Sequence, residues 1–306
     1  MGDSARPPTN GGMPFIEARP ARGGTMDITT KPPSDPELHD PTGRHVRVAF
    51  VGKGGSGKST ISGTFARLLA RLVDDPVVAL DSDPLPGMPY ALGIGVDDDP
   101  IPAEAVVEGP DGGPRWIIDP AMTADEFIER HAAFGPDGVR YLQFGNLWGH
   151  VVALRQAQFA WSQVVRELDP QRWHLVGDLP GGTRQPMAGW AKYADVVCVV
   201  VEPTTKSLLS ARRLLNLRRA EWRPLHLLVV ANKVNGPDDV HRIADRLAVE
   251  VSAVVPHDAR VLDGDRKGSA PLDSAPDGPF ADAVTALVER VVGLYPRVQP
   301  STEVTS

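Results

Sequence analysis

A glycine-rich segment at residues 52–60 (GKGGSGKST) lies between two stretches with different hydrophobic patterns. Residues 45–51 (HVRVAFV) form a short, largely apolar and β-branched run that ends at a glycine, which is typical of a buried strand. Residues 59–73 carry apolar side chains at helical spacing, namely Ile61, Phe65, Leu68, Leu69 and Leu72. We therefore expect a strand, a flexible loop and a helix, with the loop wrapped around an anion at the helix N-terminus.

The spacing within this segment is that of a phosphate-binding loop, or P-loop, G-x-x-x-x-G-K-[ST]. In such a loop Lys58 is expected to bridge the β- and γ-phosphates of a nucleoside triphosphate, and the hydroxyl of Ser59 is expected to hold Mg²⁺. The alternative is a glycine-rich turn that only connects a strand to a helix, but both the motif and its context favour nucleotide binding. The other loop residues expected at the phosphates are Gly54, Gly55, Ser56, Gly57 and Thr60.

Further apolar runs alternate with helical patterns along the chain. The runs read as strands at residues 76–80, 173–177, 195–201, 225–231 and 251–255. The helical patterns lie at residues 205–221, 237–249 and 279–295. This alternation predicts an α/β fold, a P-loop NTPase with a mostly parallel sheet covered by helices on both faces.

The amino-acid composition and the hydrophobic pattern differ from the rest of the chain at both ends and in one internal stretch. Residues 1–43 are rich in proline and glycine and are predicted to be disordered, and residues 297–306 form a second disordered tail. Between them, residues 44–296 are predicted to form one ATPase domain. Residues 97–149 are less regular and read as an insertion, with a hairpin near residues 109–114 and a helix near residues 123–133.

A second lysine in the loop, Lys53, follows its first glycine directly, which an ordinary P-loop does not require. GKGGSGKST resembles the deviant loop of the MinD/ParA/nitrogenase-iron-protein group. In that group the early lysine reaches the nucleotide of the facing subunit, as an arginine finger does. The resemblance implies an ATP-dependent homodimer in which Lys53 and Lys58 both act in catalysis. A solvated loop lysine is the alternative for Lys53.

Two other segments match the same group in the expected order. Residues 77–84 (VVALDSDP) resemble its strand-to-switch segment, which implies that Asp83 contacts Mg²⁺ and positions the attacking water while Asp81 supports it. Residues 174–182 (HLVGDLPGG) resemble a later strand end. By that resemblance Asp178 also binds Mg²⁺, through water, and Gly181 and Gly182 respond to the γ-phosphate. An aspartate after a strand is also common as a turn or helix cap.

The predicted base site favours adenine over guanine. Residues 228–234 (LVVANKV) put Asn232 and Lys233 at a strand end, where this group holds the base. Guanine readers of the N-K-x-D type use a carboxylate at the fourth position, whereas this chain has Asn235, whose amide offers one acceptor oxygen. An asparagine such as Asn232 can pair with the amino group and a ring nitrogen of adenine. Pro256, followed by a histidine and an aspartate, resembles the loop that closes over the base.

Within the group, residues 194–213 and 254–273 most resemble the CooC-type ATPases, which assist the maturation of a nickel enzyme. Those ATPases carry a close cysteine pair at the dimer interface, and this chain has one cysteine in all, Cys198, inside a run of valines. We expect Cys198 in the core. His150 falls roughly where the cysteines would be expected, but one histidine is a poor metal site and a structural role is favoured.

Composition limits the remaining classes of function. A net charge of −7 disfavours a general nucleic-acid coat protein, and the lone cysteine fits a reducing cytoplasm. No secretory signal and no apolar stretch of about twenty residues are evident. The last predicted helix offers no basic stripe for a membrane surface. One basic cluster consists of Arg212, Arg213, Arg218, Arg219 and Arg223. Nonspecific DNA binding would need such a cluster, but a cluster of this kind is more often a solvated helix face.

Three functions remain open from the sequence. The first is an ATP-binding and hydrolysing dimer switch of the MinD/ParA type that regulates or positions an unidentified protein partner. The second is a CooC-like ATPase that assists the maturation of a metalloenzyme or complex. The third is a nucleotide-binding regulatory module with little turnover.

Overall fold

The computed structural model describes residues 44–83, 85–95, 101, 103–111, 115–144, 151–219 and 223–295. The predicted tails at residues 1–43 and 297–306 lie outside the described residues, as do Pro84 and His150. Within the described ranges, none of the helices combines the length and the apolar character that crossing a membrane demands.

The centre of the fold is an eight-stranded sheet in which seven strands run parallel, as predicted. β5 pairs antiparallel with β6 at one edge. The strands are short runs of apolar, mostly β-branched residues, and β1 and β8 are buried at every position. Across the sheet the order is β10 (Ala253–Pro256), β9 (His226–Val234), β8 (Val196–Val201), β1 (Arg47–Gly52), β7 (His174–Asp178), β2 (Val77–Asp81), β6 (Arg140–Gln143) and β5 (Ala133–Phe134).

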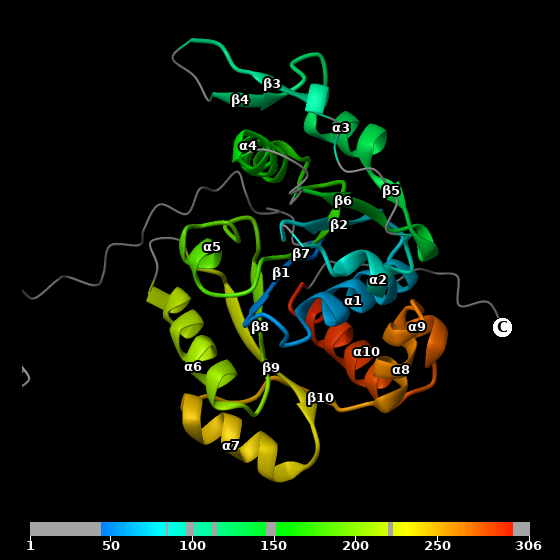
Figure 1. Ribbon diagram of the computed structural model, residues 1–306, viewed down its shortest axis with the longest axis vertical. Helices are drawn as coiled ribbons and strands as arrows, with labels where there is room; N and C mark the ends of the chain where they lie inside the picture. The colour runs from blue at the N-terminus through cyan, green and yellow to red at the C-terminus, as the bar shows by residue number, and fades with distance from the viewer. Residues whose placement is uncertain are drawn as a thin grey trace, which may run out of the picture. The chain divides into compact units, whose positions relative to one another are not determined.

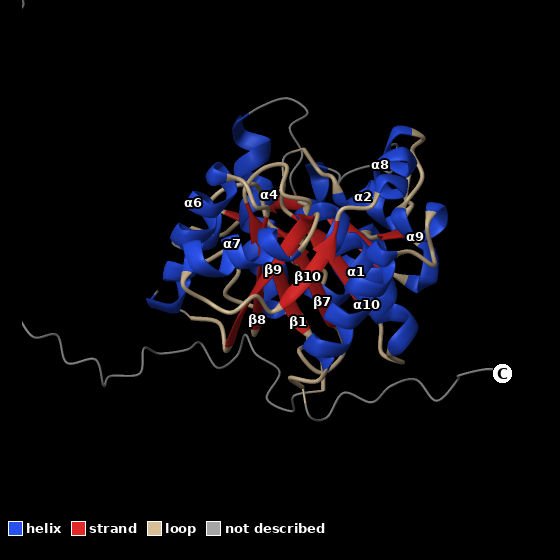
Figure 2. Ribbon diagram, turned by 90° about the horizontal axis from the view of Figure 1, so that it is seen from below, coloured by secondary structure: helices blue, strands red, loops and turns tan. Residues whose placement is uncertain are grey.

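Helices cover both faces of this sheet (Figures 1 and 2). One face carries the two long helices α1 (Lys58–Leu72) and α10 (Pro279–Val292), whose apolar sides join the even-numbered residues of β1 in one buried cluster. Shorter helices pack near α1, namely α2 (Met88–Leu92), α8 (Ala259–Arg266) and α9 (Pro271–Ser274).

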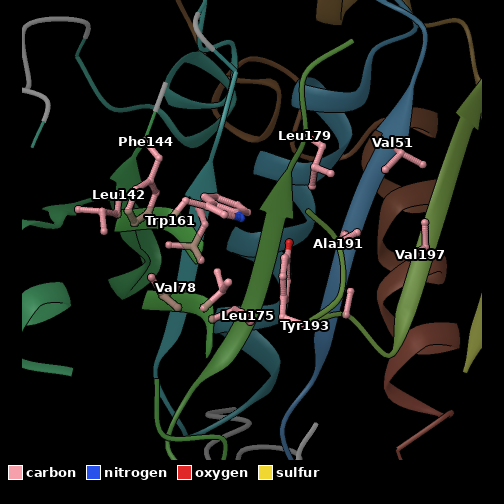
Figure 3. Packing of buried hydrophobic residues seen from close by; sticks show 14 of the residues in the cluster. Val51, Val78, Leu142, Phe144, Trp161, Leu175, Leu179, Ala191, Tyr193 and Val197 are labelled. Atoms are coloured by element: carbon pink, nitrogen blue, oxygen red, sulfur yellow. The ribbon is translucent and has the colours of Figure 1, made fainter. Parts of the chain in front are cut away.

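The other face carries a second buried cluster. Trp161 and Tyr193 lie near its middle (Figure 3). Their rings meet edge to face, with centroids 6.0 Å apart. The helices around this cluster are α3 (Ala124–His131), α4 (Val151–Glu167), α5 (Arg184–Met187), α6 (Thr205–Leu214) and α7 (Pro237–Leu247). Short 3₁₀ turns complete the chain at Ala103–Ala105, Pro136–Gly138 and Leu215–Arg219.

Part of the stretch expected to be an insertion belongs to the main sheet. β6 pairs in parallel with β2, and β5 extends the sheet beyond it. The expected hairpin is present as β3 (Val106–Glu108) and β4 (Trp116–Ile118), which pack on α4, and α3 forms the expected helix behind a Thr123–Glu126 capping box. Residues 97–149, predicted as an insertion inside the domain, therefore include a peripheral hairpin and a strand pair that belongs to the main sheet.

Candidate functional site

The predicted site residues gather at the edge of the sheet where the parallel strands end. β1 ends at Gly52, β2 at Asp81, β7 at Asp178 and β10 at Pro256, while Asn232 and Lys233 lie just before Val234 at the end of β9. Because parallel strands present their carboxyl ends to one edge, a single fold feature brings these five segments together.

The loop between β1 and α1 is a compact turn. The backbone N–H of Ser56 donates to the carbonyl of Lys53 at 3.0 Å, and α1 begins when Ile61 N–H bonds to the carbonyl of Gly57. Gly57 has a φ of 86°, which favours glycine, and a Cβ there would lie 2.2 Å from Nδ2 of Asn232. Lys58 is 5% exposed, so its side chain is buried, and its charge is close enough to act on the carboxylate of Asp178.

Two side chains from β9 hold the loop in place from behind. Asn232 donates from Nδ2 to the carbonyl of Ser56 at 2.8 Å, and Lys233 donates from Nζ to the carbonyl of Gly55 at 2.8 Å. Lys233 also forms an ion pair with Glu202, 2.6 Å from Nζ to Oε1. The sequence placed Asn232 and Lys233 at the base, and base contact stays a prediction; their contact with the loop and the role of Glu202 were missed.

The segment after β2 is anchored by Asp81 rather than by Asp83. Asp81 is fully buried and accepts hydrogen bonds from the backbone N–H groups of Asp83, at 2.8 Å, and Met88, at 3.3 Å. The half-buried Asp83 accepts one bond from the N–H of Leu85 at 3.0 Å. Gly87 lies against Ser59, since a Cβ on it would be 3.0 Å from that residue's Cβ. Asp83 thus stands on a loop that touches the P-loop helix.

Asp178 places a buried carboxylate beside the P-loop. Both of its oxygens are inaccessible to solvent and form no hydrogen bond of good geometry among the described residues, although the hydroxyl of Ser59 lies near them. Burial raises the pKa of Asp178 to about 6, although Lys58 and the hydroxyl of Ser59 act in the opposite direction. Burial also raises the pKa of Asp81, and the charge of Asp178 raises it further. Carboxylate and hydroxyl oxygens are ligands that Mg²⁺ prefers, so Asp178 and Ser59 fit such an ion.

The glycines after β7 touch the P-loop directly. The N–H of Gly182 donates to the carbonyl of Gly52 at 2.8 Å. A Cβ on Gly181 would lie 2.8 Å from both N and Cα of Gly54, so this position has no room for a side chain. A movement of either segment must therefore displace the other.

Lys53 is oriented differently from Lys58. It is partly exposed and donates from Nζ to the carbonyl of its neighbour Gly54 at 2.9 Å. It does not line the cavity beside the loop. The two lysines of this loop therefore lie in different surroundings. Lys58 is buried and lines the cavity, whereas Lys53 is partly exposed and does not line it.

A cavity of about 460 Å³ opens beside the N-terminus of α1. Its polar end is formed by Gly55, Gly57, Lys58, Ser59 and Thr60. From there it runs to the end of β10 and to α8, and Tyr90, Leu262 and Asp265 are lining residues that the sequence did not identify. The lining away from the loop includes Tyr90, Asn232, Lys233, Pro256, His257, Asp258, Leu262 and Asp265. A phosphate-binding end and a partly apolar far end suit a nucleotide.

Two candidate metal positions elsewhere lack suitable chemistry. Cys198 is buried in β8, as expected, and burial raises the pKa of its thiol. At the opposite edge of the sheet, His45, Asp75 and His174 approach one another. Nδ1 of His174, however, accepts the N–H of Val46 at 2.9 Å, which places the ring proton on Nε2 and disfavours metal ligation there.

Comparisons with known proteins agree with this geometry. Residues 48–272 match the family described as the CobQ/CobB/MinD/ParA nucleotide binding domain. The carbon monoxide dehydrogenase accessory protein CooC of Rhodospirillum rubrum is 26% identical over 266 residues, 80% of this chain and 97% of CooC. An uncharacterized ATP-binding protein of Methanocaldococcus jannaschii is 28% identical over 71% of this chain and 87% of its own length.

Among solved structures, the septum site-determining protein MinD of Pyrococcus horikoshii, complexed with Mg-ADP, has a TM-score of 0.61. Its sequence is 19% identical, and the match covers 83% of this chain and 98% of that one. The fold, the P-loop and the family match agree. This chain belongs to the CobQ/CobB/MinD/ParA nucleotide binding domain family and is a P-loop ATPase of the MinD/ParA or CooC type.

Proposed function

We propose that this protein is an ATP-binding and hydrolysing switch that closes into a homodimer and acts on a protein partner. The observation that carries the proposal is the pair of lysines in one loop. Lys58 is buried within the loop, whereas Lys53 is partly exposed outside the nucleotide cavity. A second cation that does not face its own nucleotide is available to that of a second subunit, and a two-fold axis would make the exchange mutual.

The residues of one subunit account for nucleotide binding. The P-loop would hold the phosphates, with Lys58 bridging the β- and γ-phosphates, and the base would lie toward Asn232, Lys233 and Pro256. Mg²⁺ would be held by Ser59, Asp178 and Asp83, and when bound it offsets the negative charge that develops on the phosphates.

The role of each side chain in hydrolysis follows from its position. Asp83 orients the attacking water, and Asp81 fixes the backbone that carries Asp83 through its bond to the N–H of that residue. Lys53 of the opposite subunit stabilises the charge on the transferred phosphoryl group. Gly181 and Gly182 contact the P-loop, so a movement of the P-loop on loss of the γ-phosphate also moves the segment after β7. That movement weakens the dimer.

A second candidate function is that of a maturation ATPase. The observation in its favour is the match to CooC, which spans 97% of that protein. Against a metal cargo carried by a cysteine pair stands the lone Cys198, buried in the sheet. An ATPase that assists a client protein without transferring a metal is compatible with both the match to CooC and the lone buried cysteine. We also propose that the protein is cytoplasmic.

The test is the variant Lys53→Ala. It should bind ATP with unchanged affinity but lose ATP-dependent dimerisation, measured by light scattering with a slowly hydrolysed analogue. Phosphate release should fall by about 10³-fold, because cations supplied in trans contribute roughly 10³–10⁵ to the rate.

The matched control is Lys206→Ala, which removes an exposed lysine at the start of α6. It should dimerise and hydrolyse ATP normally. Normal dimerisation and turnover in Lys53→Ala would refute the exchange of lysines, and a protein that hydrolyses no ATP in the wild-type form would instead favour the regulatory module.

A further inference from the structure

A small depression between α6 and α7 is lined by three arginines. Its volume is about 180 Å³, and its lining consists of Arg212, Arg242 and Arg246 with Thr205, Leu208 and Leu209. The two helices are neighbours at the β8–β9 side of the sheet (Figure 1). No acidic side chain lines the depression among the described residues.

The three arginines are not neutralised within the part of the chain that the structure describes. None of them forms an ion pair with a carboxylate there, although eleven such contacts occur elsewhere. Nη2 of Arg212 donates to the backbone carbonyl of Arg246 at 2.7 Å, which holds one guanidinium at the rim. Arg242 and Arg246 are four residues apart on α7, and like charges at that spacing destabilise a helix. In a chain of net charge −7 this concentration of cations is a local exception.

The depression also has an apolar wall. Leu208 is buried, but Leu209 is 52% exposed beside the arginines. A ligand that buries Leu209 and neutralises guanidinium groups must carry both anionic groups and an apolar side chain. Arginine binds carboxylates through two parallel hydrogen bonds, which makes it suited to this task.

We propose that this depression binds an acidic segment of a partner protein, one that places an aspartate or glutamate among the three guanidinium groups and an apolar side chain on Leu209. Duplex nucleic acid fits less well. Its phosphates form an extended row without apolar groups, whereas these arginines surround one small hollow with an exposed leucine.

A short chain of contacts connects the first turn of α6 to the P-loop. Glu202 pairs with Lys233, whose ammonium group holds the carbonyl of Gly55, and α6 begins three residues after Glu202. The N–H of Glu202 also bonds to Oγ of Ser207 in the first turn of α6 at 3.0 Å. Binding of the acidic segment does not require ATP hydrolysis, so it can be tested apart from the proposed switch.

The probe is a fluorescein-labelled peptide of twelve residues in which each pair of glutamates is followed by a leucine, with a second peptide that has glutamine for glutamate. Anisotropy is measured without nucleotide on the full chain. The acidic peptide should bind and the glutamine peptide should bind at least about tenfold more weakly. Affinity should fall as salt is raised, because the contacts are ionic.

Three variants locate the binding. Arg242→Glu replaces an exposed side chain of the depression and should weaken binding of the acidic peptide at least about tenfold. Leu209→Ser should weaken it several-fold, by removing apolar contact. Arg213→Glu makes the same charge change on α6 outside the depression and should leave the affinity within about twofold. Melting temperatures confirm that each variant is folded.

The proposal is overturned if the wild-type chain does not bind the acidic peptide, or if Arg213→Glu weakens it as much as Arg242→Glu does. It is also overturned if a 20-base-pair DNA duplex binds more tightly than the peptide and Leu209→Ser leaves both affinities unchanged. That result would assign the surface to nucleic acid.

Discussion

Replacing Asp178 by asparagine should stabilise the protein in the absence of nucleotide and magnesium. The carboxylate is fully buried, and its two oxygens form no hydrogen bond of good geometry among the described residues, although the hydroxyl of Ser59 lies near them. Its pKa is raised from 3.8 to about 6, so the charged form is disfavoured by folding even though Lys58 is nearby. Asparagine mimics the neutral, protonated form of this side chain.

The size of the effect follows from the pKa. The interval between 3.8 and about 6, at 1.36 kcal/mol per pH unit, corresponds to about 3 kcal/mol. An acid whose folded pKa is raised contributes stability below its unfolded pKa and loses it as the pH rises through the folded value. The wild-type free energy of unfolding should thus fall by about 2.4 kcal/mol between pH 4 and pH 7 on account of this group. Asp178→Asn should not show that part of the fall.

The assay is urea unfolding of chain stripped of nucleotide and kept in chelator, from pH 4 to pH 8. The variant should exceed the wild type by about 0.5 kcal/mol at pH 4, about 1.5 kcal/mol at pH 5 and about 3 kcal/mol at pH 8. Asp245→Asn, an exposed change on α7, is the control and should stay within about 0.5 kcal/mol at every pH.

Adding ATP and magnesium should reverse the order, because the wild type gains ligand stabilisation that Asp178→Asn loses in part. A variant less stable than the wild type at pH 8 without ligand would refute the reasoning. It would show that Lys58 and Ser59 more than offset the burial of the charge.

Three further predictions concern the same edge of the sheet. Asp83→Asn should retain ATP binding while hydrolysis slows about 10²-fold or more, since a positioned proton acceptor typically contributes 10²–10⁴; a normal rate of phosphate release would move that role to another residue. ATP should bind at least about tenfold more tightly than GTP in competition experiments, because Asn235 lacks the second acceptor oxygen that guanine readers use; equal affinities would remove the adenine assignment. Gly181→Ala should weaken ATP binding about tenfold and cost about 1–3 kcal/mol of stability, because its Cβ would press on Gly54 at 2.8 Å. Gly95→Ala, where a Cβ meets nothing within 4 Å, is its control and should behave as wild type.

The parallel core could be predicted because its strands carry strong local signals. β1, β2, β7, β8, β9 and β10 all correspond to expected apolar runs, which are continuous since both faces of the sheet are covered. β6 was missed because RYLQ is short and mixes polar with apolar residues, and only its pairing with β2 makes it a strand. The predicted helix at residues 205–221 is shorter in the structure, where α6 ends at Leu214 and a 3₁₀ turn follows.

The candidate site likewise has features that local sequence motifs predict and features that they do not. The P-loop motif fixes its own conformation through glycines such as Gly57, and the strand ends bring Asp178 beside Lys58. Contacts between distant loops leave no such local pattern. The ion pair of Lys233 with Glu202 joins the ends of β9 and β8, and neither residue type at those positions distinguishes it from a solvated charge. Tyr90 lines the cavity because α2 packs on α1, which periodicity does not reveal.

The hydrogen bonds of Asn232 and Lys233 to the P-loop bear on the thermodynamics of nucleotide binding. The carbonyls of Gly55 and Ser56 are held by side chains of β9 within the folded chain itself. Ordering a free backbone would cost about 1–2 kcal/mol per residue at the moment of binding, and here that ordering is part of folding. Truncating Lys233 would transfer this entropy loss from the folding step to the association step. Nucleotide affinity would then fall with little change in enthalpy, although Lys233 need not touch a phosphate.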